Sequence, residues 1–345
     1  MSATNPSNKD GDKPPGPRMK RFWRIAVLAN IKDEKKPKPE GVPSDAFADF
    51  DHIETVQSIQ KAIETDGHET KFIIADENLP YALKEYNPDI CFNIAEGLGG
   101  DAREAQVPAL LEMLRIPYTG SRVLTNAIAL DKTLTKRIWR DRRLPVAPFQ
   151  EFATGDEPLR PELKFPLFVK PAREGTGMGV DMKARVENEA EMRERVKYVI
   201  HSYQQPALVE NFLPGREFTV GQLGRMAVNT RQLGEKGAPE YVCPADVEPE
   251  LAKKLHHFAL RGHLLLFATD VSRVDFRLDA EGNPRLMEIN PLPGLTPGYS
   301  DLCLQAAAEG ISYEDLILEI LYLAAGRWGL IEPRDLPVRT SNKKK

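Results

Sequence analysis

The sequence has 345 residues, 41% of them hydrophobic and 28% charged, and its formal net charge of −4 argues against general nucleic-acid binding. Its three cysteines form no CxxC pair, which fits a reducing cytoplasm, and its six histidines show no spacing that would predict a zinc site. It has no run of about 18 apolar residues, so we expect no membrane-spanning segment.

The N-terminal third alternates strand and helix patterns. After a polar stretch at 1–20, which we expect to be a disordered tail, apolar runs predict buried strands and apolar residues at helical spacing predict helices. The strands are expected at 22–29, 71–75 and 90–94, and the helices at 53–63 and 107–114. Such alternation is typical of a parallel sheet with helices on its faces, and it predicts an α/β domain at 21–121.

From residue 130 onward, the sequence mixes helices with short strands. Helices are expected at 130–142, 187–201, 249–266 and 313–325, and strands at 165–170, 207–213 and 217–221. We expect residues 333–345 to form a second tail.

Two alternating runs around a Gly/Asn/Pro turn at 279–284 predict a β-hairpin. Side chains two apart in a strand share a face, so the polar residues of each run point the same way. The expected cross-strand pairs are Leu278 with Arg285, Asp275 with Glu288, and Arg273 with Asn290.

The expected pairing of Asp275 with Glu288 puts two carboxylates face to face. Like charges directly opposite each other destabilise a sheet, and a hard divalent cation removes that conflict. Two carboxylates and the amide oxygen of Asn290, completed by waters and phosphates, suit Mg²⁺. The hairpin therefore predicts a Mg–nucleotide site with Arg273 beside it.

A glycine loop at 170–180 follows a strand and is expected to lead into a second extended segment at 180–182. It differs from the strand-to-helix loops of dinucleotide folds, and the GxxxxGK[ST] pattern is absent. Glycines let backbone N–H groups close on phosphate oxygens, and Lys170 supplies a point charge for phosphate. Taken alone, a plain flexible hairpin explains the loop equally well.

Other charged residues have an ordinary interpretation beside a functional one. Lys132 lies on an amphipathic helix, where a lysine is usually solvated. Glu210 and Glu217 are each either a surface carboxylate or an acceptor for a ribose diol. Arg273 is either a charge partner for a neighbouring carboxylate or a clamp on a phosphoryl group or oxyanion. Gly294 is either a turn glycine or a backbone donor to the same oxyanion.

In this order, the segments resemble the ATP-grasp superfamily and, within it, the D-alanine–D-alanine ligase family. The resemblance runs from about residue 91 to 325 and is densest at 116–121, 130–132, 144–146, 170–179, 210–218 and 287–296. It implies an α/β, ATP-grasp fold in which two α+β subdomains enclose ATP. The implied units are a Rossmann-like N-terminal domain at 21–121, a central subdomain at 122–213 and a catalytic subdomain at 214–332.

The resemblance also assigns roles to matching positions. ATP would be bound by Lys132 and Lys170 at the phosphates, Thr176 in the loop that closes over them, Glu210, Asn211 and Leu213 at the adenine, and Glu217 at the ribose. Mg²⁺, or Mn²⁺ in its place, would be held by Asp275, Glu288 and Asn290. The acyl phosphate and the tetrahedral intermediate would be stabilised by Arg273 and Gly294.

The chemistry that the family implies is carboxylate activation. A carboxylate attacks the γ-phosphate of ATP, giving an acyl phosphate and ADP, and an amine then expels phosphate. The resemblance implies amino-acid or peptide substrates and a homodimer through the N-terminal domain. The net charge and the lack of a long apolar run predict no nucleic-acid or membrane partner.

The departures from the family pattern cluster on the amino-acid side. The first loop, at 30–37, lacks the family's paired glycines and Ser-x-Glu, which leaves Asp51 and Glu54 as candidates for the ammonium-binding carboxylate. The usual His-Gly segment is replaced at 95–104. The loop that covers the second substrate is shortened to 225–242 and lacks its Lys-Tyr.

The changed segments also carry extra charge, at Glu96, Asp101, Arg103 and Glu104, and Tyr299 replaces the serine that closes the site, with Ser300 adjacent. Charge in these positions would favour a larger or charged substrate. The candidate substrate residues are Glu96, Arg103, Tyr299 and Ser300. The sequence thus predicts a carboxylate–amine ligase whose substrates need not be two D-alanines.

Two other classes of function stay open. One is a non-catalytic nucleotide-binding protein, against which the intact Asp275, Glu288, Asn290 and Arg273 argue. The other is an ATP-grasp kinase that phosphorylates a small molecule without an amine acceptor. A requirement for an amine before phosphate is released would separate a ligase from a kinase.

Overall fold

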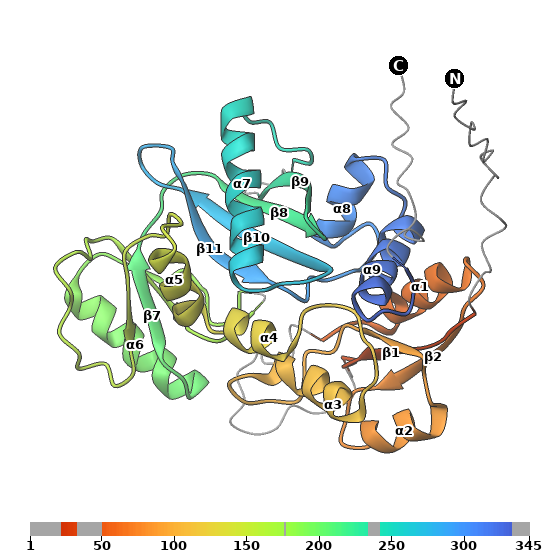
Figure 1. Ribbon diagram of the computed structural model, residues 1–345. Helices are drawn as coiled ribbons and strands as arrows, with labels where there is room; N and C mark the ends of the chain where they lie inside the picture. Colours follow the sequence, from red (N-terminus) through yellow and green to blue (C-terminus); the bar gives the residue numbers. More distant parts are fainter. Residues whose placement is uncertain (1–21, 33–49, 176, 234–241, 333–345) are drawn as a thin grey trace, which may run out of the picture.

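The computed structural model describes residues 22–32, 50–175, 177–233 and 242–332. The expected tails at 1–20 and 333–345, and Thr176, lie outside the described residues. The described chain folds around three separate sheets, with helices packed against each of them (Figure 1). None of the helices in these ranges is long and apolar enough to cross a membrane.

The N-terminal sheet is parallel, as the alternation of strand and helix patterns predicted. Its strand order is β2-β1-β3, and β1 pairs in parallel with both neighbours. The strands are β1 (Arg24–Ala29), β2 (Glu69–Ile74) and β3 (Ile90–Asn93), and the helices are α1 (Ile53–Glu64), α2 (Leu79–Tyr86) and α3 (Gln106–Leu114). The β1 strand is central because its residues from Ile25 onward are fully buried.

The second sheet is antiparallel and has the order β4-β7-β5-β6. Its strands are β4 (Phe149–Phe152), β5 (Leu167–Pro171), β6 (Arg185–Val186) and β7 (Ala207–Asn211). Helix α6 (Glu189–Tyr203) packs against it, whereas α4 (Val123–Leu130) and α5 (Lys132–Asp141), which precede it in the chain, contact the third sheet. The glycine loop does join two antiparallel strands, but the expected extended segment at 180–182 is wrong, because the second strand begins only at Arg185.

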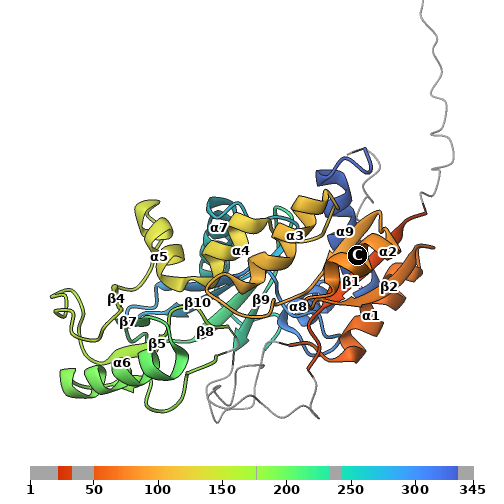
Figure 2. The ribbon, with the colours of Figure 1, turned by 90° about the horizontal axis from the view of Figure 1, so that it is seen from below.

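The third sheet has the order β11-β10-β8-β9. It consists of β8 (Glu217–Leu223), β9 (Met226–Leu233), β10 (Val271–Leu278) and β11 (Pro284–Asn290). Helix α7 (Pro249–Leu265) packs against all four strands, and α8 (Asp301–Ala308) packs against β8 and β9 (Figures 1 and 2). The interpretation of 225–242 as a loop is wrong for its first half, since β9 occupies it; residues 234–241 lie outside the described residues.

The hydrophobic core of the N-terminal sheet includes residues from the far end of the chain. Helix α9 (Tyr313–Arg327) lies beside α1, and its buried residues from Leu316 to Ala325 share one cluster with β1 and α1 (Figure 1). At the same junction, Arg327 Nη2 lies 2.7 Å from Asp270 Oδ2, which also accepts the backbone N–H of Gly120. We propose unit boundaries at 21–121, 122–213 and 214–332, with α9 packed back onto the first unit.

Candidate functional site

The β10–β11 hairpin brings the expected carboxylates together. Asp275 pairs with Glu288 and Arg273 pairs with Asn290, as predicted. The expected pair at the turn is wrong: Leu278 pairs with Pro284, one residue earlier, and a β-bulge between Asp275 and Phe276 restores the register. A bulge inserts an extra residue in one strand. Here it offsets the one-residue shift in register at the turn, so the pairs at Asp275 and Arg273 are the expected ones.

Arg273 is the centre of an ion-pair network on this hairpin. Its Nε lies 3.0 Å from Asp275 Oδ1, its Nη2 lies 2.9 Å from Asp275 Oδ2, and its Nη1 lies 3.1 Å from Asp301 Oδ2. The Thr219 hydroxyl donates to Asp275 Oδ1 at 2.6 Å, and Arg231 pairs with the other oxygen of Asp301. Burial alone would lower the pKa of Arg273, but the two carboxylates outweigh it and raise that pKa.

Glu288 faces a lysine from a different unit. Lys132, at the start of α5, has its Nζ 3.3 Å from Glu288 Oε2 and also donates to the backbone carbonyl of Glu174. Burial would raise the pKa of Glu288, but Lys132, Lys170 and Arg273 lower it to about 2. The repulsion expected between Asp275 and Glu288 is therefore relieved in part by Arg273 and Lys132.

A magnesium site on this hairpin would rest on few protein ligands. Among the described residues, no three His, Cys, Asp or Glu side chains gather in a metal-binding group. The carboxylates of Asp275 and Glu288 face each other across the hairpin, and Asn290, which pairs with Arg273, offers an amide whose Oδ1 also accepts the N–H of Leu292 at 2.8 Å. This hard-oxygen set fits Mg²⁺, which usually keeps several waters and takes the rest of its shell from phosphates.

A second group of charges is completely enclosed. Lys170 Nζ lies 2.9 Å from Glu210 Oε1, and Lys136 Nζ lies 2.8 Å from Glu210 Oε2. Glu210 on β7 pairs with Phe168 on β5. Lys170 follows Phe168 by two positions, so it lies on the same face of the sheet and is the diagonal neighbour of Glu210. Burial opposes ionisation of Glu210, but the two lysines lower its pKa to about 2. We call Lys132, Lys136, Lys170, Glu210 and Glu288 the lysine cluster.

Sequence reasoning missed Lys136 as a functional candidate, although a signal was present. Lys136 follows Lys132 by four positions on α5, and residues four apart on a helix lie on the same face. The Asp131 side chain caps this helix by accepting the N–H of Leu134 at 2.9 Å. The cap fixes where the helix begins, and so it directs both lysines toward the strands that carry Glu210 and Glu288.

The predicted adenine and ribose residues lie where β7 ends and β8 begins, and in the linker between them. Glu217 opens β8 and lies 3.2 Å from Arg277 Nη1, and burial raises its pKa. The carboxylate of Glu210 lies between the ammonium groups of Lys136 and Lys170. The amide oxygen of Asn211, where β7 ends, accepts the N–H of Lys164, and Leu213 lies in the linker toward β8.

The segment 96–104 contacts the glycine loop. Arg103 Nη2 lies 3.2 Å from Glu174 Oε2, and Arg173 Nη1 lies 2.6 Å from Asp101 Oδ2. Arg103 also donates to the carbonyl of Arg173. The expected substrate charges at Asp101 and Arg103 are thus engaged with the loop that follows Lys170. Glu96 is partly buried beside Gly97, whose N–H donates to Asn30.

Tyr299 and Ser300 behave differently from each other. Tyr299 is 78% exposed, whereas Ser300 Oγ accepts the N–H of Thr296 at 3.0 Å and lies near Gly294. The Thr296 hydroxyl in turn meets the buried Thr55 hydroxyl of α1 at 2.9 Å. Ser300 therefore shapes the loop after Asn290, and that loop is tied to the N-terminal unit.

Of the two candidates for the ammonium-binding carboxylate, Asp51 is the more enclosed. It lies just before α1, and burial raises its pKa to about 7. Glu54, in the first turn of α1, is exposed. An enclosed carboxylate gains more than an exposed one from an incoming cation.

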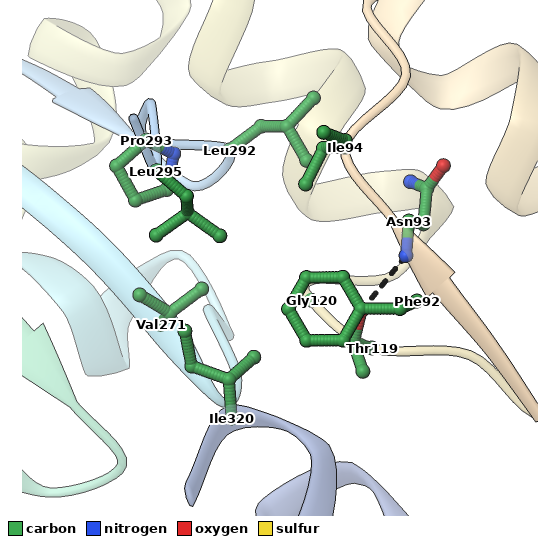
Figure 3. Close-up of a pocket in the computed structure, with 10 residues that line it drawn as sticks. All are labelled: Phe92, Asn93, Ile94, Thr119, Gly120, Val271, Leu292, Pro293, Leu295 and Ile320. Atoms are coloured by element: carbon green, nitrogen blue, oxygen red, sulfur yellow. Dashed lines mark hydrogen bonds between the residues drawn. The ribbon is translucent and has the colours of Figure 1, made fainter. Parts of the chain in front are cut away.

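A small apolar pocket lies where the N-terminal sheet meets the loop after β11 (Figure 3). Leu292, Pro293 and Leu295 line one side, and Phe92 and Ile94 line the other. Among the described residues that line it, the polar side chains are those of Asn93 and Thr119, and Thr119 accepts the N–H of Asn93 at 2.9 Å. A cavity without charged walls does not fit the charged ends of an amino acid, so we do not place the substrates in it.

Comparison with known proteins agrees with this geometry. A family model described as the D-alanine–D-alanine ligase C-terminus matches residues 138–322. An uncharacterised protein, y4sG, of Sinorhizobium fredii is 35% identical over 298 residues, which cover 79% of this chain and 87% of that protein. The D-alanine–D-alanine ligase of Geotalea uraniireducens is 33% identical over 285 residues, covering 78% and 89%.

Solved structures show the same fold. The D-alanine–D-alanine ligase of Bacillus anthracis, crystallised with ATP, aligns with a TM-score of 0.73 at 24% identity, covering 89% of this chain and 99% of that one. The enzyme of Coxiella burnetii aligns with a TM-score of 0.71 at 20% identity. The mixed parallel and antiparallel sheets described above therefore form an ATP-grasp arrangement.

Proposed function

The chain belongs to the D-alanine–D-alanine ligase family of ATP-dependent carbon–nitrogen ligases, and from that premise we propose that it joins two amino acids, or an amino acid and a peptide, of which at least one is not D-alanine. The observation that carries this proposal is the contrast within one site. The ATP-grasp charges around Arg273 are complete and paired, whereas the segments that would meet the amino acids depart from the family pattern.

The nucleotide half of the site would act through positioning and charge. Lys132, which pairs with Glu288, and Lys170, which pairs with Glu210, would bind the phosphates, and Glu217 would accept the ribose hydroxyls. Asp275, Glu288 and Asn290 would hold Mg²⁺, which when bound neutralises charge on the β- and γ-phosphates. Thr176, in the glycine loop, lies outside the described residues and stays a prediction.

The substrate half would act on the carboxylate. An oxygen of the donor carboxylate attacks the γ-phosphorus and ADP leaves; the acceptor amine then attacks the acyl carbon and phosphate leaves. The guanidinium of Arg273 would stabilise the negative charge that develops, and a backbone N–H at Gly294 would add a second donor to the oxyanion. Asp51 would bind the ammonium of the donor amino acid.

The structure also changes the proposed role of Arg103. The sequence suggested that Arg103 contacts substrate, yet its guanidinium is held by Glu174 and the carbonyl of Arg173. We therefore propose that Arg103 positions the glycine loop. Glu96, Tyr299 and Ser300 stay candidates for the substrate side, and a homodimer through the N-terminal unit stays a prediction from family analogy.

The test is an ADP-release assay with a panel of D- and L-amino acids, supplied singly and in pairs. A ligase of the proposed kind releases ADP and phosphate only when a carboxylate donor and an amine acceptor are both present, and it forms a dipeptide that mass spectrometry detects. Turnover confined to D-alanine would refute the altered specificity. ADP release from a single non-amine substrate would favour the kinase, and no ADP release from any pair would favour the non-catalytic protein.

A further inference from the structure

Lys136 is a charged residue that the proposed chemistry does not use. It lies on α5, its exposed fraction is 0%, and its Nζ is 2.8 Å from Glu210 Oε2. The other oxygen of Glu210 lies 2.9 Å from Lys170, the residue proposed to bind phosphate. A fully buried lysine is rare, because removing an ammonium from water costs several kcal/mol unless a carboxylate compensates it.

The charges of the lysine cluster do not cancel. Lys132 is paired with Glu288, which leaves two ammonium groups, on Lys136 and Lys170, sharing one carboxylate on Glu210. Burial lowers the pKa of Lys136, and the adjacent carboxylate of Glu210 opposes that shift. With both lysines protonated, the enclosed group of three carries one net positive charge. Since all three side chains are almost completely buried, water screens that charge weakly, and it acts on any anion brought to Lys170.

We propose that Lys136 is a positioning residue for the nucleotide: by sharing Glu210 with Lys170, it keeps the charge of Lys170 available to phosphate. Without Lys136, one carboxylate would face one ammonium, and Lys170 would be neutralised by Glu210. This inference rests on the proposed ATP site and adds to it a residue that touches neither ATP nor substrate.

Lys136 also connects the two sheets that enclose the site. Its Nζ donates to the carbonyl of Leu286 on β11 at 3.2 Å, while Glu210 lies on β7. Leu286 precedes the bulge after which Glu288 follows. One ammonium thus holds the strand that carries Glu210 and the strand that carries Glu288 at a fixed separation, so Lys170 and Glu288 keep their relative positions.

The proposal is tested by binding rather than by turnover. Titration calorimetry with ADP plus Mg²⁺ and, separately, with adenosine compares the parent with Lys136→Met. We expect the affinity for ADP to fall about tenfold and the affinity for adenosine to stay within about twofold, since adenosine has no phosphate to sense the lost charge. Loosened packing alone would weaken the binding of both probes.

Two further variants make the test specific. Lys136→Arg keeps a positive charge beside Glu210, so we expect it to retain most of the ADP affinity that Lys136→Met loses. Arg137→Met, one residue along α5, removes an outward charge whose side chain is 48% exposed and lies 3.8 Å from Glu151, so it controls for loss of charge from the helix.

Unchanged ADP affinity in a folded Lys136→Met protein overturns the inference, as does equal weakening for ADP and adenosine. If Lys136→Met does not fold, Lys136→Arg decides: a folded Lys136→Arg protein that binds ADP more than about tenfold weaker than the parent overturns it. A parent protein that binds neither probe overturns the proposed ATP site itself, which distinguishes the two failures.

Discussion

The lysine cluster differs from the substrate segments in the kind of structure that carries its side chains. We define the substrate segments as 96–104 and 299–300. The cluster lies on a helix and on paired strands, its members are mostly enclosed, and each charge has a partner from another element. The substrate segments are loops or single helical turns, and Tyr299 is 78% exposed. Charges on rigid elements are set once for every substrate, whereas charges on loops are free to differ between relatives.

Arg273 lies between the two regions, and its loss gives the largest expected effect. Arg273→Met leaves Asp275 and Asp301 without their shared cation and removes the donor proposed for the oxyanion, so we expect the rate constant of ADP release to fall about a thousandfold at saturating ATP. Arg285→Met, on the same hairpin, removes the ion pair with Asp279 near the turn and should change the rate less than about twofold. A variant of Arg273 that keeps a tenth of the parent rate would contradict this role.

A variant of Asp51 tests whether the residues proposed to bind substrate include a carboxylate whose charge is not balanced by a nearby cation. The pKa of Asp51 in the folded protein is about 7, above the ordinary value of 3.8, so the folded state holds a proton that the unfolded state has released. Its contribution to stability is therefore present at low pH and is lost as the pH rises from about 4 to about 7. We expect the parent to lose about 2 kcal/mol relative to Asp51→Asn across this range, half of the full linkage because the carboxylate is partly exposed.

Urea unfolding of both proteins at pH 4, 6 and 8 measures this difference. The sharpest comparison is with Glu210, whose pKa of about 2 gives stability that is present above pH 4.5 and is lost only as the pH falls toward 2. If the difference in free energy of unfolding between the parent and Asp51→Asn is the same at all three pH values, the charge of Asp51 is already balanced by other groups in the folded protein.

A variant of Arg103 tests whether segment 96–104 positions the glycine loop or contacts the amino-acid substrates. If Arg103 positions the glycine loop, Arg103→Gln raises the KM for ATP about threefold and leaves the KM for the amino acids unchanged, since a partly exposed ion pair contributes well under 1 kcal/mol. Arg115→Gln, an exposed arginine at the end of α3, is the control. The opposite split, with only the amino-acid KM raised, would return Arg103 to the substrate role that the sequence suggested.

Tyr299 gives the smallest expected effect. Because its side chain points mainly into solvent, Tyr299→Phe should change each kinetic constant less than about twofold. Ser300→Ala removes the acceptor for the Thr296 N–H, and we expect it to lower the rate constant about threefold through the loop that carries Gly294. A larger effect at Tyr299 than at Ser300 would mean that the loop closes over substrate and buries the tyrosine.

The hairpin shows why much of the site could be predicted from the sequence. Alternation within a strand fixes which side chains share a face, and the pairs Asp275–Glu288 and Arg273–Asn290 follow once two runs and a turn are recognised. The error at Leu278 had no effect on the site, because the bulge absorbed it. Lys136 was also within reach, from its four-residue spacing to Lys132.

The remaining features depend on contacts between segments that are far apart in the chain. Arg103 meets Glu174 across 71 positions of sequence, and no local periodicity reports such a pairing. The short elements were missed for a different reason: α8 and β4 have eight and four residues, too few to establish a period against their neighbours. Strand β9 was taken for a loop because family comparison placed a substrate-covering loop there.

The packing of α9 on α1 has a consequence for biosynthesis. A ribosome makes β1, α1 and β3 some 200 residues before it makes α9, yet the core around Ile25 and Ile59 is closed by Leu316, Ile320 and Ala324. Until that helix has emerged, the nascent N-terminal unit exposes the apolar face that α9 will cover, and such surfaces are what chaperones bind. The final folding of the first-made unit therefore waits for nearly the whole chain.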